Sequence, residues 1–335
     1  MKINTVTGQI DADALGTTLI HEHLFTGYEG WQYDPNVSVD MEKIRHKAIS
    51  RLKDLKTYGV STFVDPCPIE LGRDVSFMAD VSEKSGMRIV CTTGFYFEAH
   101  GLPPYWAGRS VDDIAQLYIR EIQHGIGDTG IRAGAIKCAT GEPVVTELEK
   151  KFLKAASIAQ KETGVPIITH TQNGFGGPEQ QALFAEYGVP AHRCLIGHSC
   201  CNPHHHYHRE IVDGGSYIGF DRIGNVRVVS DEIRGERMMQ LIKAGFIAQL
   251  LISQDRFVAQ LGNSFPLWNL PAETLKKMEA AEKDGSWPPA YTYLFTDFLP
   301  TLKKQGLTDA DITQLLEENP KRFFTGEPLP APSPR

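Results

Sequence analysis

The sequence lacks the long hydrophobic run that a membrane-spanning helix needs. No stretch of about 18 consecutive apolar residues occurs, and the N-terminal segment MKINTVTGQIDADALG carries one lysine and no apolar run. We therefore expect a cytoplasmic protein with no membrane partner. A long Lys/Arg run is also missing, and 34 basic against 41 acidic residues give a formal net charge of −7. This balance argues against a nucleic-acid partner.

Cysteine is scarce, and the six cysteines include no CxxC pair. Several of them lie inside apolar, strand-like runs, where a small thiol packs well. The sequence therefore predicts no disulfide framework. Cys200 and Cys201 are adjacent, which rarely fits the geometry of one disulfide bond, and we assign them no role.

The sequence does contain a regular alternation of short apolar runs and amphipathic segments. Residues 41–58 are an example of the latter, with apolar residues every three or four positions behind Asp40 as a helix N-cap. Apolar strands alternating with helices are typical of a parallel sheet covered on both faces, and eight such units close a (β/α)8 TIM barrel. A doubly wound open sheet is the alternative. The eight predicted strands are TTLIHEHL, STFVDPC, RIVCTTG, AGAIKCAT, PIITHT, CLIGHS, SYIGFD and AQLLISQD.

A length of 335 residues with 41% apolar residues fits one α/β barrel domain, since such barrels commonly exceed about 250 residues. We expect this domain to span residues 1–325 and a Pro-rich tail to occupy 326–335 and trail off the surface. Residues 256–289, after the last strand, are predicted to form a long loop that covers the site as a lid. Helical patterns resume over 290–305 and 309–318.

Four histidines and one aspartate lie at the ends of predicted strands. In the motif HEH, His21 and His23 are two positions apart, so both side chains leave one face of a strand while Glu22 points the other way. The other strand ends, where barrel enzymes place their catalytic groups, carry His170, His198 and Asp255. A lone histidine at such a place is more often structural, but five convergent groups have few structural explanations. The pattern predicts a metal site.

Lys137 is the unusual residue of this predicted interior. It lies in the apolar strand GAIKCAT, where a buried ammonium is costly unless it is paired, neutral or modified. A chemical role explains it best. A mononuclear deaminase or amidase on the same barrel would not need this lysine, which argues against that alternative. A binding protein without catalysis is the alternative from another class.

As a set, these motifs resemble the phosphotriesterase family of the amidohydrolase superfamily, and within it the phosphotriesterase-like lactonases. The resemblance runs from HEH through EIQHGIGDTGIRAG, IKCAT, THT, IGHS and FDRIG to NPKRFF. It implies a binuclear centre of two divalent metal ions, with zinc favoured and cobalt, iron or manganese as alternatives. It also implies a homodimer and a small ester or lactone as substrate.

The resemblance further implies which residues hold the ions. The first ion would be held by His21, His23 and Asp255, and the second by His170 and His198. Lys137 would be carboxylated to N6-carboxylysine and bridge the two ions. A hydroxide bridging the ions would attack the substrate, and Asp255 would take the proton and pass it to the leaving group.

Two more residues match the lactonases. Tyr96 in TTGFYF corresponds to a tyrosine near the nucleophile, and Arg222 in GFDRIG to an arginine after the seventh strand, so both are predicted catalytic and substrate-binding residues. Their alternatives are a packing aromatic and a surface ion-pair partner. Asp221 would orient a histidine or an arginine. Trp268, in the predicted lid, would contact the substrate or else pack the loop onto the barrel.

The implied activity is the opening of lactones, such as acyl-homoserine or other γ- and δ-lactones, with promiscuous hydrolysis of phosphotriesters and aryl esters. The alternative is that the main substrate is a phosphotriester or another carboxylic ester. One departure bears on the substrate: Gln254 stands between Ser253 and Asp255 where the lactonases usually have histidine. The run HHHYH at 204–208 is predicted to be a solvated surface patch, because consecutive side chains of a helix face different directions.

Overall fold

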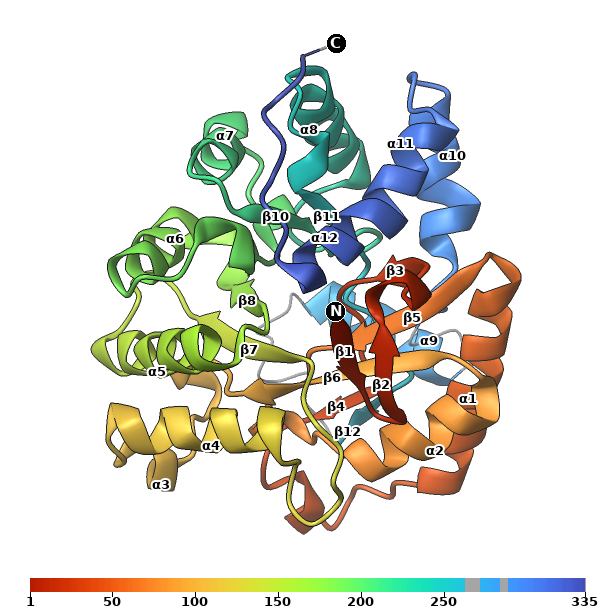
Figure 1. Cartoon of the computed structure of the whole chain (residues 1–335). Coiled ribbons are helices and arrows are strands. Elements are labelled where there is room, and N and C mark those ends of the chain that lie inside the picture. The colour runs from red at the N-terminus through yellow and green to blue at the C-terminus, as the bar shows by residue number, and fades with distance from the viewer. Residues whose placement is uncertain (263–271, 284–288, 335) are drawn as a thin grey trace.

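The structure is a computed structural model that describes residues 1–262, 272–283 and 289–334. Eight strands form one parallel sheet in the order β11-β10-β9-β8-β7-β6-β5-β3, curled into a barrel (Figure 1). Each predicted strand is present and lies beside the next in chain order, which confirms the barrel and rules out the doubly wound alternative. The strands are β3 (Thr17–Leu19), β5 (Val60–Asp65), β6 (Arg88–Gly94), β7 (Ala135–Thr140), β8 (Ile167–Thr171), β9 (Cys194–Ile196), β10 (Tyr217–Phe220) and β11 (Leu250–Ile252).

The barrel closes between the first and the last strand of the sheet, beyond the ends of both. The backbone nitrogen of Asp255 donates to the carbonyl oxygen of His21 at 3.0 Å. Further along, β4 (Phe25–Gly27) pairs in parallel with β12 (Ala259–Leu261). The two segments that follow β3 and β11 therefore run side by side toward the mouth of the barrel. We call this pairing of residues 21–27 with 255–261 the closing seam.

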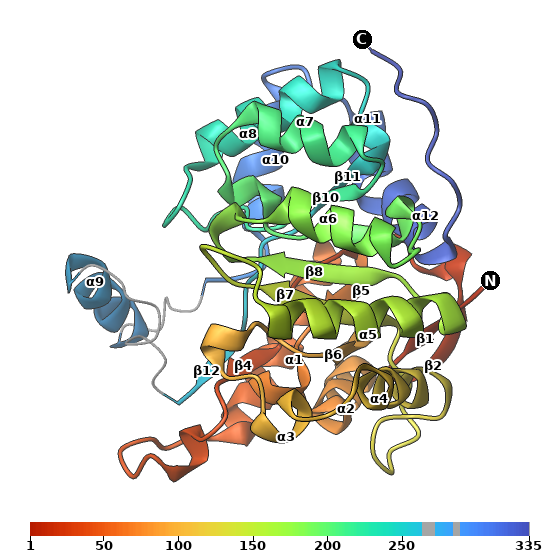
Figure 2. The ribbon, with the colours of Figure 1, turned by 90° about the vertical axis from the view of Figure 1, so that its left-hand side faces the viewer.

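Helices cover the outside of the barrel (Figures 1 and 2). The helix predicted over 41–58 is α1, and the side chain of its N-cap Asp40 accepts from the backbone nitrogen of Lys43 at 2.9 Å. Two π-helical segments, Leu294–Phe298 and Gln314–Glu318, lie in the predicted C-terminal helical regions. No helix in the described part of the chain is long and apolar enough to cross a membrane. The helices are α1 (Met41–Thr57), α2 (Val75–Ser85), α3 (Pro104–Ala107), α4 (Val111–Gln123), α5 (Glu147–Thr163), α6 (Gly177–Glu186), α7 (His205–Asp213), α8 (Asp231–Lys243), α9 (Ala272–Lys283), α10 (Leu299–Lys303), α11 (Asp309–Thr313) and α12 (Asn319–Thr325).

An apolar layer fills the barrel below the mouth. Every strand of the barrel, or the residue next to it, contributes one buried residue to this layer. The hairpin of β1 (Lys2–Thr5) and β2 (Gly8–Asp11) and the aromatic side chain of Phe323 join the same cluster. Figure 2 shows the hairpin at the end of the barrel opposite to the mouth. The members of the layer from the strands are Ile20, Val64, Val90, Ala135, Ile168, Leu195, Tyr217 and Leu251.

The segment after β11 is more regular than the sequence predicted. Its first part forms β12, which pairs with β4 in the closing seam, and a later part forms α9. In Figure 2, α9 lies beyond the strand ends to which the arrowheads point, on the side of the barrel mouth. Trp268, and with it Phe265 and Leu267, lies outside the described residues. The tail is irregular but does not simply trail away, since the backbone nitrogen of Ser333 donates to the carbonyl oxygen of Gly245 at 3.3 Å.

Candidate metal centre

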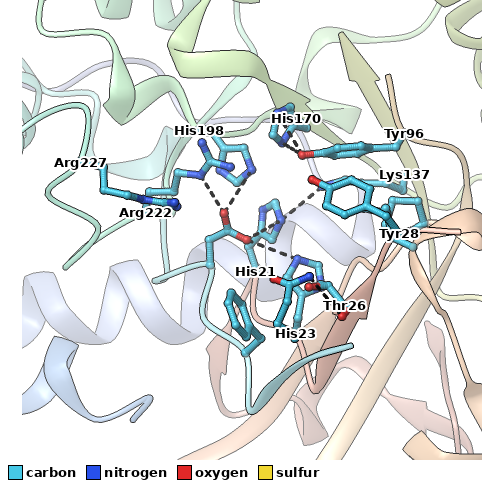
Figure 3. Close-up of a pocket in the computed structure, with 15 residues that line it drawn as sticks. His21, His23, Thr26, Tyr28, Tyr96, Lys137, His170, His198, Arg222 and Arg227 are labelled. Carbon is cyan, nitrogen blue, oxygen red and sulfur yellow. Dashed lines mark hydrogen bonds and ion pairs between the residues drawn. The ribbon is translucent and has the colours of Figure 1, made fainter. Parts of the chain in front are cut away.

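The strand-end residues meet in one cavity of about 100 Å³ at the mouth of the barrel (Figure 3). Each predicted site residue that lies in the described part of the chain lines it. Polar and apolar side chains that the sequence had not indicated complete the wall, among them Tyr28, Arg227 and Phe257. The predicted residues that line the cavity are His21, His23, Tyr96, Lys137, His170, His198, Arg222 and Asp255.

The side chains reach the cavity through backbone that has left the strands. His21 and His23 were predicted on a strand, but β3 ends at Leu19 and both residues lie in the closing seam. His198 and Asp255 follow β9 and β11 in the left-handed region, with φ of 57° and 52°. A left-handed backbone is uncommon away from glycine and is typical of functional sites. These turns point both side chains into the mouth.

The carboxylate of Asp255 occupies the middle of the histidine group. Its Oδ1 lies 3.3 Å from Nε2 of His23 and 3.8 Å from Nε2 of His21. Its Oδ2 lies 3.7 Å from Nε2 of His198 and accepts from Nε of Arg222 at 2.7 Å. His21, His23 and Asp255 thus offer three ligand atoms within 4.8 Å of one another. This spacing suits a divalent cation with nitrogen and oxygen ligands.

Two buried carboxylates outside the cavity orient the imidazoles. Asp221 accepts from Nδ1 of His21 at 2.9 Å and from Nδ1 of His198 at 3.1 Å. Asp65 accepts from Nδ1 of His23 at 2.9 Å. Because Nδ1 of each ring donates to a carboxylate, Nε2 of each ring faces the cavity, as in metal-binding histidines. The prediction that Asp221 orients a neighbouring side chain is met for two histidines at once.

The protonation of the imidazoles also fits a cation site. Burial, with the nearby Lys137 charge, lowers the pKa of His21 to about 3, and burial lowers the pKa of His170 well below its usual range. Both rings are therefore neutral and able to bind a metal. Burial lowers the pKa of His23 too, but hydrogen bonds with Asp255 and Asp65 outweigh it and hold that pKa well above its ordinary value. Positive charge is favoured where His23 and Asp255 meet.

Lys137 lies on β7 and is buried against the same group. Its Nζ is 3.2 Å from Nε2 of His21, and its exposed fraction is 2%. Burial lowers the pKa of the ammonium to about 8, although the nearby carboxylates favour the charged form. The lysine is thus placed among proposed metal ligands rather than paired with a carboxylate at hydrogen-bond distance.

Tyr96 and Arg222 lie at the site, as predicted, and neither is a surface residue. The Tyr96 hydroxyl lies 3.3 Å from Nδ1 of His170, and burial raises the pKa of the phenol well above its usual range, so it stays protonated. Only 13% of the Arg222 side chain is exposed. Its guanidinium is paired with Asp255. Tyr28 adds a second phenol to the wall, and its hydroxyl lies 3.0 Å from Nδ1 of His100.

The family model of the phosphotriesterase family matches residues 1–324. The chain belongs to the phosphotriesterase family. It is 36% identical to an aryldialkylphosphatase of Saccharolobus solfataricus, over 94% of this chain and 97% of that one. It is 26% identical to a phospho-furanose lactonase of Mycoplasmopsis agalactiae, over 96% and 91% of the two chains. A solved variant of a PTE-like lactonase from Deinococcus radiodurans matches with a TM-score of 0.86 and 34% identity, over 96% and 99% of the two chains.

The departure at Gln254 lies outside the cavity of this phosphotriesterase-family enzyme. The Gln254 side chain is buried, with its amide oxygen accepting from the backbone nitrogen of Leu294 at 3.1 Å and its amide nitrogen donating to the carbonyl oxygen of Tyr291. The Tyr291 hydroxyl donates to the carbonyl oxygen of His23 at 2.5 Å. Gln254 therefore ties the C-terminal segment to the closing seam and does not line the cavity.

The histidine run at 204–208 is only partly the solvated patch that the sequence predicted. His204 and His206 are exposed, but His208 is buried on α7 and its Nε2 donates to the carbonyl oxygen of Ser199 at 3.0 Å. The inward turn of the helix carries this ring into the core. Across the described ranges, no group of ligand atoms suited to a metal includes this run or the adjacent Cys200 and Cys201, which are free and buried.

Several residues that shape the site gave little signal in the sequence. Asp65 ends the strand VSTFVD, and that position alone could have marked it. Glu22 is fully buried, and its carboxylate accepts from the backbone nitrogens of Gln254 at 2.8 Å and Arg256 at 2.9 Å. Burial raises the Glu22 pKa to about 8 in spite of these bonds. The partners of Glu22 lie more than 230 positions away, so no local pattern could indicate them.

Proposed function

We propose that this enzyme of the phosphotriesterase family hydrolyses lactones, with phosphotriesters and aryl esters as secondary substrates. The observation that carries the proposal is the protonated Tyr96 phenol, 3.3 Å from His170 in a cavity of only about 100 Å³. A flat lactone ring fits such a space more readily than the three substituents of a phosphotriester around tetrahedral phosphorus.

The donor set supports two divalent ions, with zinc as the proposed metal. His21, His23 and Asp255 would hold the first, and His170 and His198 the second, since neutral imidazoles and a carboxylate suit zinc and its neighbours. The ions would supply Lewis acidity, which lowers the pKa of a water molecule toward neutrality and polarises the substrate carbonyl. Lys137 would join both halves of the site as a carbamate.

The carbamate would form when the neutral amine of Lys137 attacks carbon dioxide, with one N–C bond made and one proton released. Burial supports this reaction because it favours the neutral amine of Lys137. The neighbouring imidazole of His21 would also be better matched by an anionic ligand between two cations than by a second cation. The modification would turn an unfavourable buried cation into an oxygen donor between the ions.

The chain's own groups would carry the proton and orient the ester. Asp255 accepts the proton of the attacking water and delivers it to the ring oxygen that leaves, which opens the lactone to a hydroxy acid. The Tyr96 hydroxyl donates to the oxygen of the substrate on which charge develops. Arg222 fixes the orientation of Asp255 through its 2.7 Å hydrogen bond. The phenols of Tyr96 and Tyr28 form part of the cavity wall.

The relatives support the same reaction type but divide over the substrate. The names of two refer to lactonases, and that of the third to a phosphatase acting on aryl dialkyl phosphates. Small γ- and δ-lactones are the substrates we propose, and acyl-homoserine lactones are the acylated members of that class to be tested. A homodimer remains a prediction, which a mass measurement in solution would test.

The deciding experiment compares kcat/KM of one zinc-loaded preparation for a γ-lactone, a δ-lactone, an acyl-homoserine lactone, an aryl ester and an aryl phosphotriester. We expect a lactone to be preferred over the phosphotriester by about 100-fold, which corresponds to about 2.7 kcal/mol of transition-state discrimination. The same panel on Tyr96→Phe separates a contribution of the phenol from that of the ions. Preference for the phosphotriester in the unchanged enzyme would contradict the proposal.

A further inference from the structure

A second arginine stands at the cavity beside the one that holds Asp255. Arg227 follows β10 by seven positions and lines the same cavity as Arg222, and both side chains lie on one side of the site in Figure 3. Arg227 is also an exposed residue as a whole. It was not indicated by any motif in the sequence.

Buried groups fix the loop that carries Arg227. The guanidinium of Arg234, 1% exposed, donates to Asp231 at 2.7 Å and to the carbonyl oxygen of Asn225 at 2.6 Å. The Asp231 carboxylate in turn accepts from the backbone nitrogen of Gly224 at 3.0 Å. The base of the loop is thus pinned on both sides. The side-chain oxygen of Asn225 accepts from Nε of Arg227 at 3.0 Å, which orients the guanidinium.

The charges around this cavity are unbalanced toward the positive. Among the described lining residues Asp255 is the single carboxylate, and it already contacts three histidines and Arg222. Partial desolvation, and then the neighbouring charge of Arg222, lower the pKa of Arg227 from its ordinary value. The guanidinium of Arg227 still carries its charge at neutral pH. An anion that entered the cavity would relieve the repulsion between the two arginines.

We propose that Arg227 recognises an anionic substituent, a carboxylate or a phosphate, on the lactone that the site opens. The inference rests on the proposed lactonase function. The guanidinium presents paired N–H donors whose geometry matches two oxygens of either group, and its position at the mouth leaves the reacting ring free to reach Asp255. Arg227 is therefore a specificity-determining residue rather than a catalytic one.

A neighbouring apolar cavity offers a place for an acyl chain, which is the alternative to an anionic substituent. This second cavity, of about 200 Å³, is lined mainly by apolar groups such as Val226, Phe257 and Met278, and it shares Arg227 and Asp255 with the first. An apolar acyl chain that extended from the reacting ring into it would pass Arg227 and remove water from a charged group without replacing its hydrogen bonds, which is costly. An anion replaces those bonds. The anionic substituent is thus favoured over a long acyl chain.

The test compares four lactones on the zinc-loaded full chain: γ-butyrolactone, its 5-carboxylate, its phosphorylated 5-hydroxymethyl derivative, and an acyl-homoserine lactone. We expect an anionic lactone to have the highest kcat/KM. In Arg227→Gln the ratio of kcat/KM for the anionic lactone to that for the unsubstituted lactone should fall about 10- to 100-fold. The ratio for Arg227→Lys should lie between those of Arg227→Gln and the unchanged enzyme. The carboxylated and phosphorylated arms identify which anion is preferred. Arg120→Gln, which removes one charge from an exposed position on α4, is the matched control.

Binding of the ring-opened products separates this inference from the proposed function. Titration calorimetry with 2-hydroxyglutarate and 4-hydroxybutyrate, the products of the carboxylated and unsubstituted lactones, needs no turnover. If the protein opens no lactone but binds the dianion more tightly, and Arg227→Gln removes that difference, the anion site stands and the lactonase proposal falls. Two results would overturn the role of Arg227. The first is that Arg227→Gln changes neither the ratio of kcat/KM between anionic and unsubstituted lactones nor the difference in affinity between the two products. The second is that the unchanged enzyme prefers the acylated lactone.

Discussion

Nε of Arg222 donates to Oδ2 of Asp255 at 2.7 Å, while Oδ1 of the same carboxylate faces His23 at 3.3 Å. Burial alone would raise the pKa of Asp255, but the charge of Arg222 and the histidines hold it well below its usual range. The carboxylate is therefore ionised and fixed in one orientation. A group with this arrangement can bind a cation through one oxygen and direct the other toward a proton.

Replacing Asp255 with asparagine tests that role. The amide keeps an oxygen for a metal but cannot take up a proton, so we expect bound zinc to be retained and kcat for the preferred lactone to fall about 10²- to 10⁴-fold. Metal analysis and steady-state kinetics on one preparation measure both. Asp213→Asn, on the surface of α7, serves as the control. Turnover close to that of the unchanged enzyme would mean that another group moves the proton.

Replacing Lys137 with methionine tests the bridging carbamate. Methionine fills similar volume in the barrel but cannot be carboxylated, so we expect the metal content to fall from two ions per chain to one or fewer. Lys151→Met is the matched control, because its Nζ donates to the carbonyl oxygen of Ala107, away from the cavity. Metal analysis after dialysis gives the stoichiometry. Two tightly bound ions in the Lys137→Met protein would refute the carbamate.

The outer carboxylates predict a graded loss of metal affinity. Asp221 holds two imidazoles and Asp65 holds one, so Asp221→Asn should weaken zinc binding more than Asp65→Asn, each by about 10- to 100-fold. Competition with a chelator of known affinity measures the dissociation constants. Circular dichroism checks that both variants fold. Equal affinity in both variants and the unchanged protein would show that these carboxylates do not orient ligands.

Glu70 predicts a pH dependence of stability that does not involve the proposed ligands. Burial raises the pKa of Glu70 from 4.5 to about 7, although its carboxylate accepts from the backbone nitrogen of Tyr96 at 2.6 Å. The folded chain thus binds this proton more tightly than the unfolded chain. The stabilisation is fully present below pH 4.5 and is lost as pH rises through about 7, with a total on the order of 3 kcal/mol.

Urea unfolding of the unchanged protein and Glu70→Gln across pH 4.5–8 measures this contribution. The amide stays neutral, so the difference in unfolding free energy should change in favour of Glu70→Gln as pH rises. The buried Oε2 of Glu70 has no hydrogen-bond partner, so the amide nitrogen that replaces it lowers stability by a constant amount without altering the slope. A difference that does not vary with pH would contradict the raised pKa.

The sequence sufficed for the barrel and for the histidines, the lysine and the aspartate that meet at its mouth. Apolar runs that end in His170, His198 or Asp255 predict both a strand and the place of its last side chain, because the carboxyl ends of parallel strands meet at one mouth. Contacts between distant segments were out of reach. Asp65 and His23 are 42 positions apart, and nothing local to either indicates the other.

The irregular segments account for the remaining differences. His198 and Asp255 take left-handed backbone, which histidine and aspartate adopt more often than most residues, but their local sequence does not mark these two positions. The segment after β11 was predicted to be a lid because loops of that length are usually functional, yet part of it pairs with β4. That pairing depends on a partner more than 230 residues earlier. Arg227 likewise reaches the cavity only because buried Arg234 and Asp231 shape its loop.

The closing seam has a consequence for how activity is lost. His21 and His23 belong to its first segment and Asp255 to its second, so a cation bound by all three would fasten the beginning of the barrel to its end. Joining segments so far apart in sequence costs chain entropy, and each ligand that leaves returns part of that freedom. Departure of the ion and opening of the barrel wall would then be one event. In this protein, inactivation by a chelator and the first step of unfolding should share a single rate.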